Sequence, residues 1–285
     1  MATFLPGLYA FFAAAAAGCL LATAFGESRR VETNRLAAVT LAGLLATLAA
    51  AAAVVGQFGR PALLFSVFSN PGTAIFRELA SLLLALLAGA AYLTALLTGA
   101  TRRTGRKLSL LAAASGLLLA LAVGSAAVQP WRPVWNTWTL VLPTAGFAWL
   151  AGVMLAKALR ASDRESAGPA LSVLKKAEEK TRTIVSEALW ENAKLAALTP
   201  LVGLVLYFAV ASTDVSARTA LLGLLTGSDA FLFWAGVILP SVLLSFLAAA
   251  FASEALKRNP VLGIALSILS AFAAGVWQHL VLGLA

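Results

Sequence analysis

The chain has 285 residues, of which 61% are hydrophobic and 12% are charged. About 25% of the residues of a soluble domain are charged, so this composition is typical of a membrane protein. The single cysteine and the single histidine exclude an iron–sulfur cluster, a structural zinc site and a haem held by two histidines. The net charge of +9 comes from basic residues scattered over short segments, so it does not indicate nucleic-acid binding.

Eight apolar runs are long enough to cross a membrane, whose hydrocarbon core of about 30 Å takes about 20 helical residues. The runs are rich in Ala and Leu and show no alternation of polar and apolar residues, so they predict helices and not barrel strands. We therefore predict an all-α integral membrane protein with one eight-helix domain over residues 1–285. The predicted transmembrane helices are Phe4–Phe25, Leu36–Val55, Phe76–Leu97, Leu108–Val128, Leu140–Leu159, Ala188–Val210, Phe231–Ala252 and Val261–Leu282.

The basic residues are unevenly divided between the two sides of this predicted bundle. Of the 21 Lys and Arg residues, 17 lie in or beside the first, third, fifth and seventh connections. The positive-inside rule places these connections in the cytoplasm, so both termini are predicted on the outer side of the cytoplasmic (inner) membrane. Attraction of the basic connections to anionic membrane lipid follows from the same charges.

The longest cytoplasmic connection, about residues 160–190, is predicted to form a helical extension. Opposite charges recur four residues apart, as in the pairs Lys175–Glu179 and Glu178–Arg182, which is typical of a solvated helix. We interpret it as an extension that runs into the sixth transmembrane helix and anchors the topology. The alternative is a docking site for a partner protein.

Polar residues from three distant segments are predicted to share the outer face. They lie in the connection from Gly56 to Leu79, in the segment Trp131–Trp138, and near the end of the last transmembrane helix. The tryptophans of the second segment suit an aromatic belt at the membrane interface. The polar residues are Gln57, Arg60, Arg77, Glu78, Arg132, Asn136 and His279.

Glu78 is the first candidate for function among these residues. A charge at membrane depth costs roughly 2.5–3.5 kcal/mol by insertion scales, so such a residue is usually interfacial, paired or functional. A carboxylate at this place could accept a proton from a bound substrate. The alternative is that Glu78 caps the N-terminus of its helix and forms an ion pair with Arg77. In that case the proton acceptor would be His279, Asp214, Asp229 or a bound water.

Several short motifs resemble those of a known family. Gln57–Pro61 is similar to the family's H-L-G-x-P, Phe76–Leu79 to its S-R-E-I, and Pro133–Trp138 to its P-x-W-N-T-W. His279, followed by an apolar tail, is similar to a histidine of the family's last helix. With eight spans and outward termini, the whole chain resembles the membrane anchor subunit of dimethyl sulfoxide reductase-like complexes, often called DmsC.

The chain departs from the family at two places. Gln57 stands where the family usually has a histidine, and the apolar stretch Phe272–Val276 replaces a G-R-x-x-F-Y sequence ahead of His279. Both departures change residues at or near the quinol site that the resemblance implies.

The resemblance implies a menaquinol-oxidising subunit of an anaerobic respiratory complex, which is not itself catalytic for the terminal substrate. Its partners would be a four-cluster iron–sulfur subunit and a molybdopterin subunit with molybdenum or tungsten, held toward the outer face. The cofactor would be menaquinol, with no haem, iron–sulfur cluster or other metal in this chain. Glu78 would be the catalytic residue, and the residues binding menaquinol would be Gln57, Arg60, Arg77, Asn136 and His279. Arg60 and Arg132 could instead meet an acidic partner or lipid headgroups.

Other functions fit the sequence as well. The complex could run in reverse, reducing quinone for a dehydrogenase or hydrogenase, and a polysulfide-reductase-type anchor would share the eight-helix plan. A transporter would need Gly- or Pro-broken helices with polar residues at the membrane midplane, whereas the centres of the predicted spans hold almost no ionisable residue. A purely structural anchor without a quinone site is the remaining alternative.

Overall fold

The structure is a computed structural model that describes residues 4–57, 67, 69–128, 132, 134–166 and 192–283. Within these residues, eight helical segments are long and apolar enough to cross a membrane, as the sequence predicts. The helices are α1 (Phe4–Ser28), α2 (Thr33–Gln57), α4 (Ala74–Leu97), α5 (Arg102–Ala126), η1 (Trp138–Leu140), α6 (Val141–Ser166), α8 (Ala193–Ala211), α9 (Val215–Thr226), α10 (Ala230–Phe233), η3 (Trp234–Leu243), α11 (Leu244–Phe251), α12 (Ser253–Arg258) and α13 (Pro260–Gly283).

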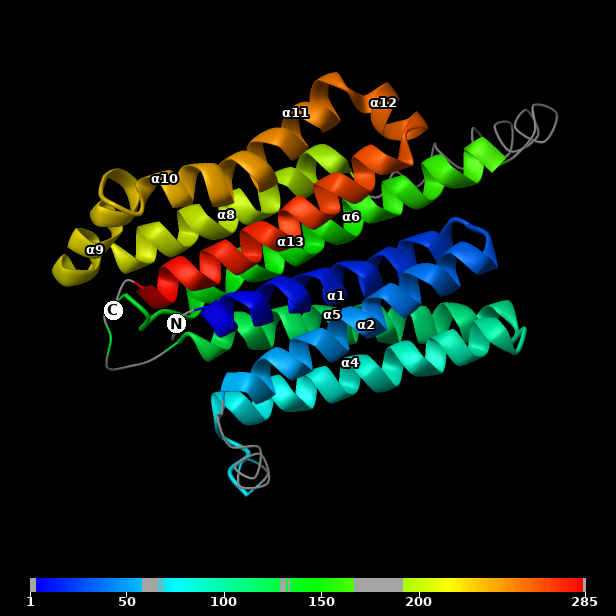
Figure 1. Ribbon diagram of the computed structural model, residues 1–285, viewed down its shortest axis with the longest axis horizontal. Helices are drawn as coiled ribbons and strands as arrows, with labels where there is room; N and C mark the ends of the chain where they lie inside the picture. Colours follow the sequence, from blue (N-terminus) through cyan, green and yellow to red (C-terminus); the bar gives the residue numbers. More distant parts are fainter. Residues whose placement is uncertain are drawn as a thin grey trace.

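Helix α1 is the central element of the bundle. Figure 1 shows α2, α4 and α5 on one side of α1 and α6, α8 and α13 on the other. Helix α1 packs directly against α2, α5, α6 and α13. One apolar cluster lies among α1, α2, α4 and α5, and a second lies among α1, α6, α8, η3 and α13.

Small residues allow the helix backbones to approach closely, as is common where transmembrane helices cross. A Cβ atom added to Gly18 of α1 would lie 2.9 Å from the Cβ of Ala151 on α6. A Cβ atom on Gly146 of α6 would lie 2.7 Å from the backbone of Pro200 on α8. These distances are too short for a real side chain, so glycine is required at both crossings.

The seventh transmembrane segment, predicted as one helix, is built from three pieces. Helix α10 leads into the π-helix η3, which contains Pro240 and continues as α11. Proline has no backbone N–H to donate, and a wider π turn is one way in which a helix accommodates that loss. An apolar groove of about 620 Å³ lies between η3–α11 and α8, lined by Leu198, Leu201, Trp234, Ala235, Ile238, Leu239, Val242, Leu243 and Phe246.

Two further features differ from the sequence prediction or lie beyond it. Helix α9, a separate element of twelve residues, occupies a stretch that was predicted as a connection. It is too short and too weakly amphipathic to stand out beside the long apolar runs. The predicted cytoplasmic extension at about 160–190 lies largely outside the described residues, as does the predicted start of the sixth helix at Ala188.

Candidate functional site

The two ends of the bundle differ in charge. One end holds the turns between α1 and α2 and between α4 and α5, and also α12 (Figure 1). We call it the basic end, and its described basic side chains are those of Arg29, Arg30, Arg35, Arg102, Arg103, Arg106, Lys107, Lys157, Arg160, Lys194, Lys257 and Arg258. The opposite end, which we call the charge-poor end, carries both termini and has Arg77, Arg132 and Arg218 as its described basic residues.

Glu78 lies in the second turn of α4 at the charge-poor end, and only 7% of its surface is exposed. It begins a stripe of buried residues spaced by one helical turn, continued by Leu82 and Ala85. Leu82 and Ala85 pack against α1 and α2. Because residues at this spacing share one helix face, the Glu78 side chain faces the protein interior. Within the described residues its carboxyl group accepts no hydrogen bond.

Glu78 is not the cap of its helix. The N-cap of α4 is Thr73, whose hydroxyl oxygen accepts a hydrogen bond of 3.2 Å from the backbone N–H of Phe76. Arg77 is exposed, and in the described part of the chain it forms no ion pair with Glu78. Glu78 therefore does not cap the helix, and its interaction with Arg77 is electrostatic without a close ion pair.

Tyr9 of α1 is a neighbour of Glu78 that sequence reasoning missed. It is 2% exposed and packs with Leu82 of α4 and Val54 of α2 in one apolar cluster. Glu78 precedes Leu82 by one helical turn on the same face of α4, so it lies at the edge of the cluster that contains Tyr9. The Tyr9 hydroxyl group has no hydrogen-bond partner among the described residues. The sequence gives only a slight indication of this role, since Tyr9 is one of three tyrosines in the chain and stands near the start of an apolar run.

The other two tyrosines are buried and hydrogen-bonded. Tyr92 of α4 donates a hydrogen bond of 2.9 Å to Oε2 of Glu27 at the basic end. Tyr207 of α8 donates a hydrogen bond of 3.0 Å to the carbonyl oxygen of Val134. Burying a hydroxyl group without a hydrogen-bond partner costs about 1–3 kcal/mol. The lack of a partner at Tyr9, unlike at the other two tyrosines, therefore requires an explanation.

Gln57 and Arg77 are exposed at the charge-poor end, at the end of α2 and in the first turns of α4. Leu5 of α1 lies beside the end of α2, since a Cβ on Gly56 would be 3.8 Å from its side chain. Gln57 and Arg77 therefore lie at the same end of α1, α2 and α4 as Tyr9 and Glu78. Arg60 lies outside the described residues.

His279 is half-buried near the end of α13, on the other side of α1 from Glu78. A Cβ atom on Gly7 of α1 would lie 3.4 Å from the Cβ of His279, which places α13 against this face of α1. Tyr9, two residues after Gly7, faces the opposite way because successive helical residues turn by about 100°. The structure therefore does not bring His279 and Glu78 together on one face of α1.

The segment before α6 is partly a structural element. Trp135 is 4% exposed, and its indole N–H donates a hydrogen bond of 2.8 Å to the carbonyl oxygen of Val281. The guanidinium carbon of Arg132 lies 4.2 Å from the centre of the Trp135 ring. Trp135 is therefore a core residue and not a member of an aromatic belt at the membrane interface. Asn136 and Trp138 are exposed, and Trp138 suits the predicted belt.

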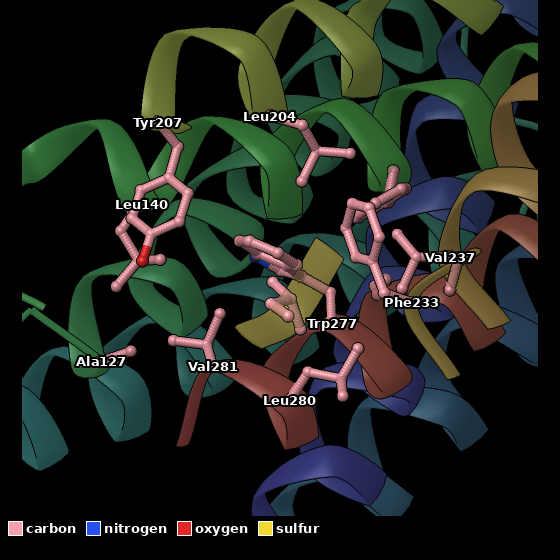
Figure 2. Packing of buried hydrophobic residues seen from close by; sticks show 14 of the residues in the cluster. Ala127, Leu140, Leu204, Tyr207, Phe233, Val237, Trp277, Leu280 and Val281 are labelled. Atoms are coloured by element: carbon pink, nitrogen blue, oxygen red, sulfur yellow. The ribbon is translucent and has the colours of Figure 1, made fainter. Parts of the chain in front are cut away.

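An aromatic cluster supports this end of the bundle. Trp277 is fully buried, and its ring contacts those of Tyr207 and Phe233 with centroids 5.4 and 6.4 Å apart. Figure 2 shows Trp277 at the centre of the cluster, with Tyr207 and Phe233 on either side. The cluster holds α8, α10 and α13 together, so it fixes the position of the α13 end that carries His279.

Asp214 is a poor alternative to Glu78 as a proton acceptor. Asp214 is the N-cap of α9, and it accepts hydrogen bonds from the hydroxyl group of Ser216 and from the backbone N–H of Ala217. These hydrogen bonds hold the pKa of the Asp214 carboxyl group below its usual value, so it does not readily take up a proton. Asp229 is exposed before α10 and makes no capping hydrogen bond.

The comparisons with known proteins leave the family open. No family model matches the chain, and no curated protein or solved structure has a significant match to it. In the described residues, no group of three or more His, Cys, Asp and Glu side chains could hold a metal ion.

Proposed function

We propose that this protein is the menaquinol-oxidising membrane anchor of a dimethyl sulfoxide reductase-like complex. The observation that carries the proposal is the state of Glu78, a buried carboxyl group without a hydrogen-bond partner among the described residues. Burying such a group costs free energy unless it has a partner or a use. Tyr9 also has a buried polar atom without a partner among the described residues, so two such groups on different helices border one apolar cluster.

The oxidation of a quinol fits this pair of groups. Quinol loses two protons and two electrons to become quinone, so the site needs a proton acceptor within hydrogen-bond reach of a ring hydroxyl. Glu78 is that acceptor in the proposed mechanism, and the proton leaves toward the charge-poor end, which faces the outer side of the cytoplasmic membrane. The two electrons pass to a four-cluster iron–sulfur subunit, and from there to a molybdopterin subunit with molybdenum or tungsten.

The remaining predicted contacts are assigned by their places in the bundle. Gln57 and Arg77 lie on the same side of α1 as Glu78, so they would contact the quinol ring or its entrance. Asn136 and His279 lie on the side of α6 and α13, so they would act at the border with the iron–sulfur subunit. The resemblance of the R-E and W-N-T-W motifs to the family supports this assignment.

Two other functions use the structure differently. An anchor that reduces quinone, or one of the polysulfide-reductase type, would use the same two groups with a different partner. A transporter would use α8 and η3–α11, two spans that each contain a proline (Pro200 and Pro240) and together line one groove. That groove is lined by apolar side chains, whereas a polar substrate needs polar groups at the membrane midplane.

The test is the substitution Glu78→Gln in the protein assembled with its partner subunits. Glutamine keeps the size of the side chain but cannot accept the proton, which is typically worth roughly 10²–10⁴-fold in rate. Quinol-dependent turnover should fall by that factor, while turnover with an artificial soluble electron donor stays unchanged. Lys257→Ala at the basic end is the control and should leave both rates unchanged. Quinol oxidation at the normal rate in the Glu78→Gln variant would overturn the proposal.

A further inference from the structure

Tyr9 stands apart from the other tyrosines of the chain. All three are almost fully buried, but only the Tyr92 and Tyr207 hydroxyl groups have hydrogen-bond partners. The Tyr9 hydroxyl group is fully enclosed and has no partner within the described residues. The hydroxyl group of a buried tyrosine normally donates a hydrogen bond to an acceptor. Without an acceptor, phenylalanine would supply the same apolar ring. A tyrosine at this place therefore indicates an acceptor that occupies the site for part of the time.

The stripes of buried residues show where that acceptor would lie. On α1 the stripe begins at Tyr9 and continues through Ala13, Ala16 and Leu20. On α4 it begins at Glu78, as described above. Both stripes belong to the apolar cluster among α1, α2, α4 and α5. Tyr9 and Glu78 thus lie at the charge-poor edge of one apolar layer, a donor on one helix and an acceptor on the other.

We infer that Tyr9 and Glu78 bind the same oxygen atom of a hydroquinone ring. The ring hydroxyl donates its hydrogen bond to the Glu78 carboxylate, and the oxygen of that hydroxyl accepts a hydrogen bond from Tyr9. This inference rests on the proposed function, and it assigns to Tyr9 a role that the motifs of the chain do not indicate. It also defines the ligand class as a ring with a hydroxyl group that becomes a carbonyl group.

The chemistry explains why a donor is needed beside the acceptor. When Glu78 takes the proton, the electron pair of the O–H bond stays on the ring oxygen, which becomes negatively charged. Loss of two electrons to the iron–sulfur partner and of the second proton from the opposite hydroxyl then gives the quinone. A fixed donor aimed at the developing charge lowers the barrier, and removal of one such donor typically costs roughly 10²–10³-fold in rate. Tyr9 keeps its own proton throughout.

The experiment uses Tyr9→Phe, which removes the hydroxyl group and keeps the ring, and Tyr92→Phe as the matched control at the other end of α4. The purified full-length protein in detergent is mixed with 2-methyl-1,4-naphthoquinone labelled with ¹³C at its carbonyl groups. Infrared difference spectra then report the carbonyl stretch of the bound quinone. A hydrogen bond from Tyr9 should shift one carbonyl band to lower frequency. The shift should be lost in Tyr9→Phe and kept in Tyr92→Phe.

Quinol turnover in the assembled complex is the second measurement. Tyr9→Phe should lower the quinol-dependent rate by roughly 10²–10³-fold, with the artificial-donor rate unchanged. If Glu78→Gln abolishes quinol turnover but Tyr9→Phe keeps both the rate and the shifted band, the inference about Tyr9 is overturned and the proposed function stands. If Glu78→Gln has no effect and no quinone binds, both are overturned. An equal loss in Tyr9→Phe and Tyr92→Phe would reduce Tyr9 to a packing residue and overturn the inference.

Discussion

Tyr92 of α4 donates a hydrogen bond of 2.9 Å to Glu27 of α1, and at the other end of the same two helices the residue types are exchanged. There Tyr9 belongs to α1 and Glu78 belongs to α4. The pair at the basic end is closed by its own hydrogen bond, whereas the Tyr9 hydroxyl group has no partner within the described residues. One pair therefore joins two helices through a hydrogen bond, whereas the Tyr9 hydroxyl group of the other pair makes none with the described residues.

The closed pair predicts a stability effect without a functional one. Tyr92→Phe removes the hydrogen bond to Glu27, and a typical intramolecular hydrogen bond contributes about 0.5–1.5 kcal/mol. The midpoint of thermal unfolding in detergent should fall by a few degrees. Tyr9→Phe removes a hydroxyl group without a partner, so its midpoint should stay the same or rise. A lower midpoint for Tyr9→Phe than for Tyr92→Phe would contradict this assignment.

A second prediction concerns the close crossing of α6 and α8. Gly146→Ala would bring a methyl group within 2.7 Å of the Pro200 backbone, so the helices must separate. Overpacking of this kind costs about 1–3 kcal/mol. Gly223→Ala in α9 is the matched control, because nothing lies within 4 Å of the added Cβ. Alanine is also the better helix former, by about 1 kcal/mol. Thermal unfolding should show opposite shifts for the two variants, and equal shifts would refute the close crossing.

A third prediction is a pH dependence at the start of α9. Because hydrogen bonds from Ser216 and Ala217 lower the pKa of Asp214, the cap contributes stability that is fully present above the unfolded pKa of about 3.9. The contribution is lost as the pH falls through the lower pKa of the folded state. Protection factors of the Ser216 and Ala217 amides should be high at pH 6 and fall below about pH 4. Asp214→Asn should show no such dependence, and a pH-dependent loss in that variant would contradict the prediction.

The spans could be predicted because their signal is local. An apolar run of about 20 residues in membrane must satisfy its backbone hydrogen bonds within the run, which leaves the helix as the solution. The predicted helix Phe76–Leu97 corresponds to α4 at Ala74–Leu97, and Val261–Leu282 corresponds to α13 at Pro260–Gly283. The division of the seventh span could not be predicted, since Pro240 stands inside an unbroken apolar run.

The candidate site could be predicted only in part. A carboxylate at the start of an apolar run is visible in the sequence, so Glu78 was identified. Tyr9 could not be identified from the sequence, because its role depends on the position of α4, which lies about 70 residues further along the chain. The burial of Trp135 was missed for the same reason, since its hydrogen-bond acceptor Val281 belongs to the last helix.

The orientation of the bundle gives a further prediction. Single cysteines are introduced at Asn136 on the charge-poor end and at Thr104 on the basic end, both exposed positions, after Cys19 is replaced by alanine. In sealed cells a membrane-impermeant thiol reagent should label Asn136→Cys, because this end faces outward in the predicted topology. Thr104→Cys should be labelled only after the membrane is opened. The reverse pattern would invert the topology and move the proposed quinol site to the cytoplasmic face.

The last prediction separates Glu78 from His279. Helix α1 lies between them, so we expect that one quinol ring oxygen does not contact both and that their effects on quinol turnover are independent. His279→Ala should lower the quinol-dependent rate less than Glu78→Gln does, and the double variant should show the product of the two factors. Independent sites give additive changes in activation free energy, whereas residues that act on one group do not. If the double variant is no slower than Glu78→Gln alone, both residues act on the same quinol, and the ring must extend over the N-terminal end of α1.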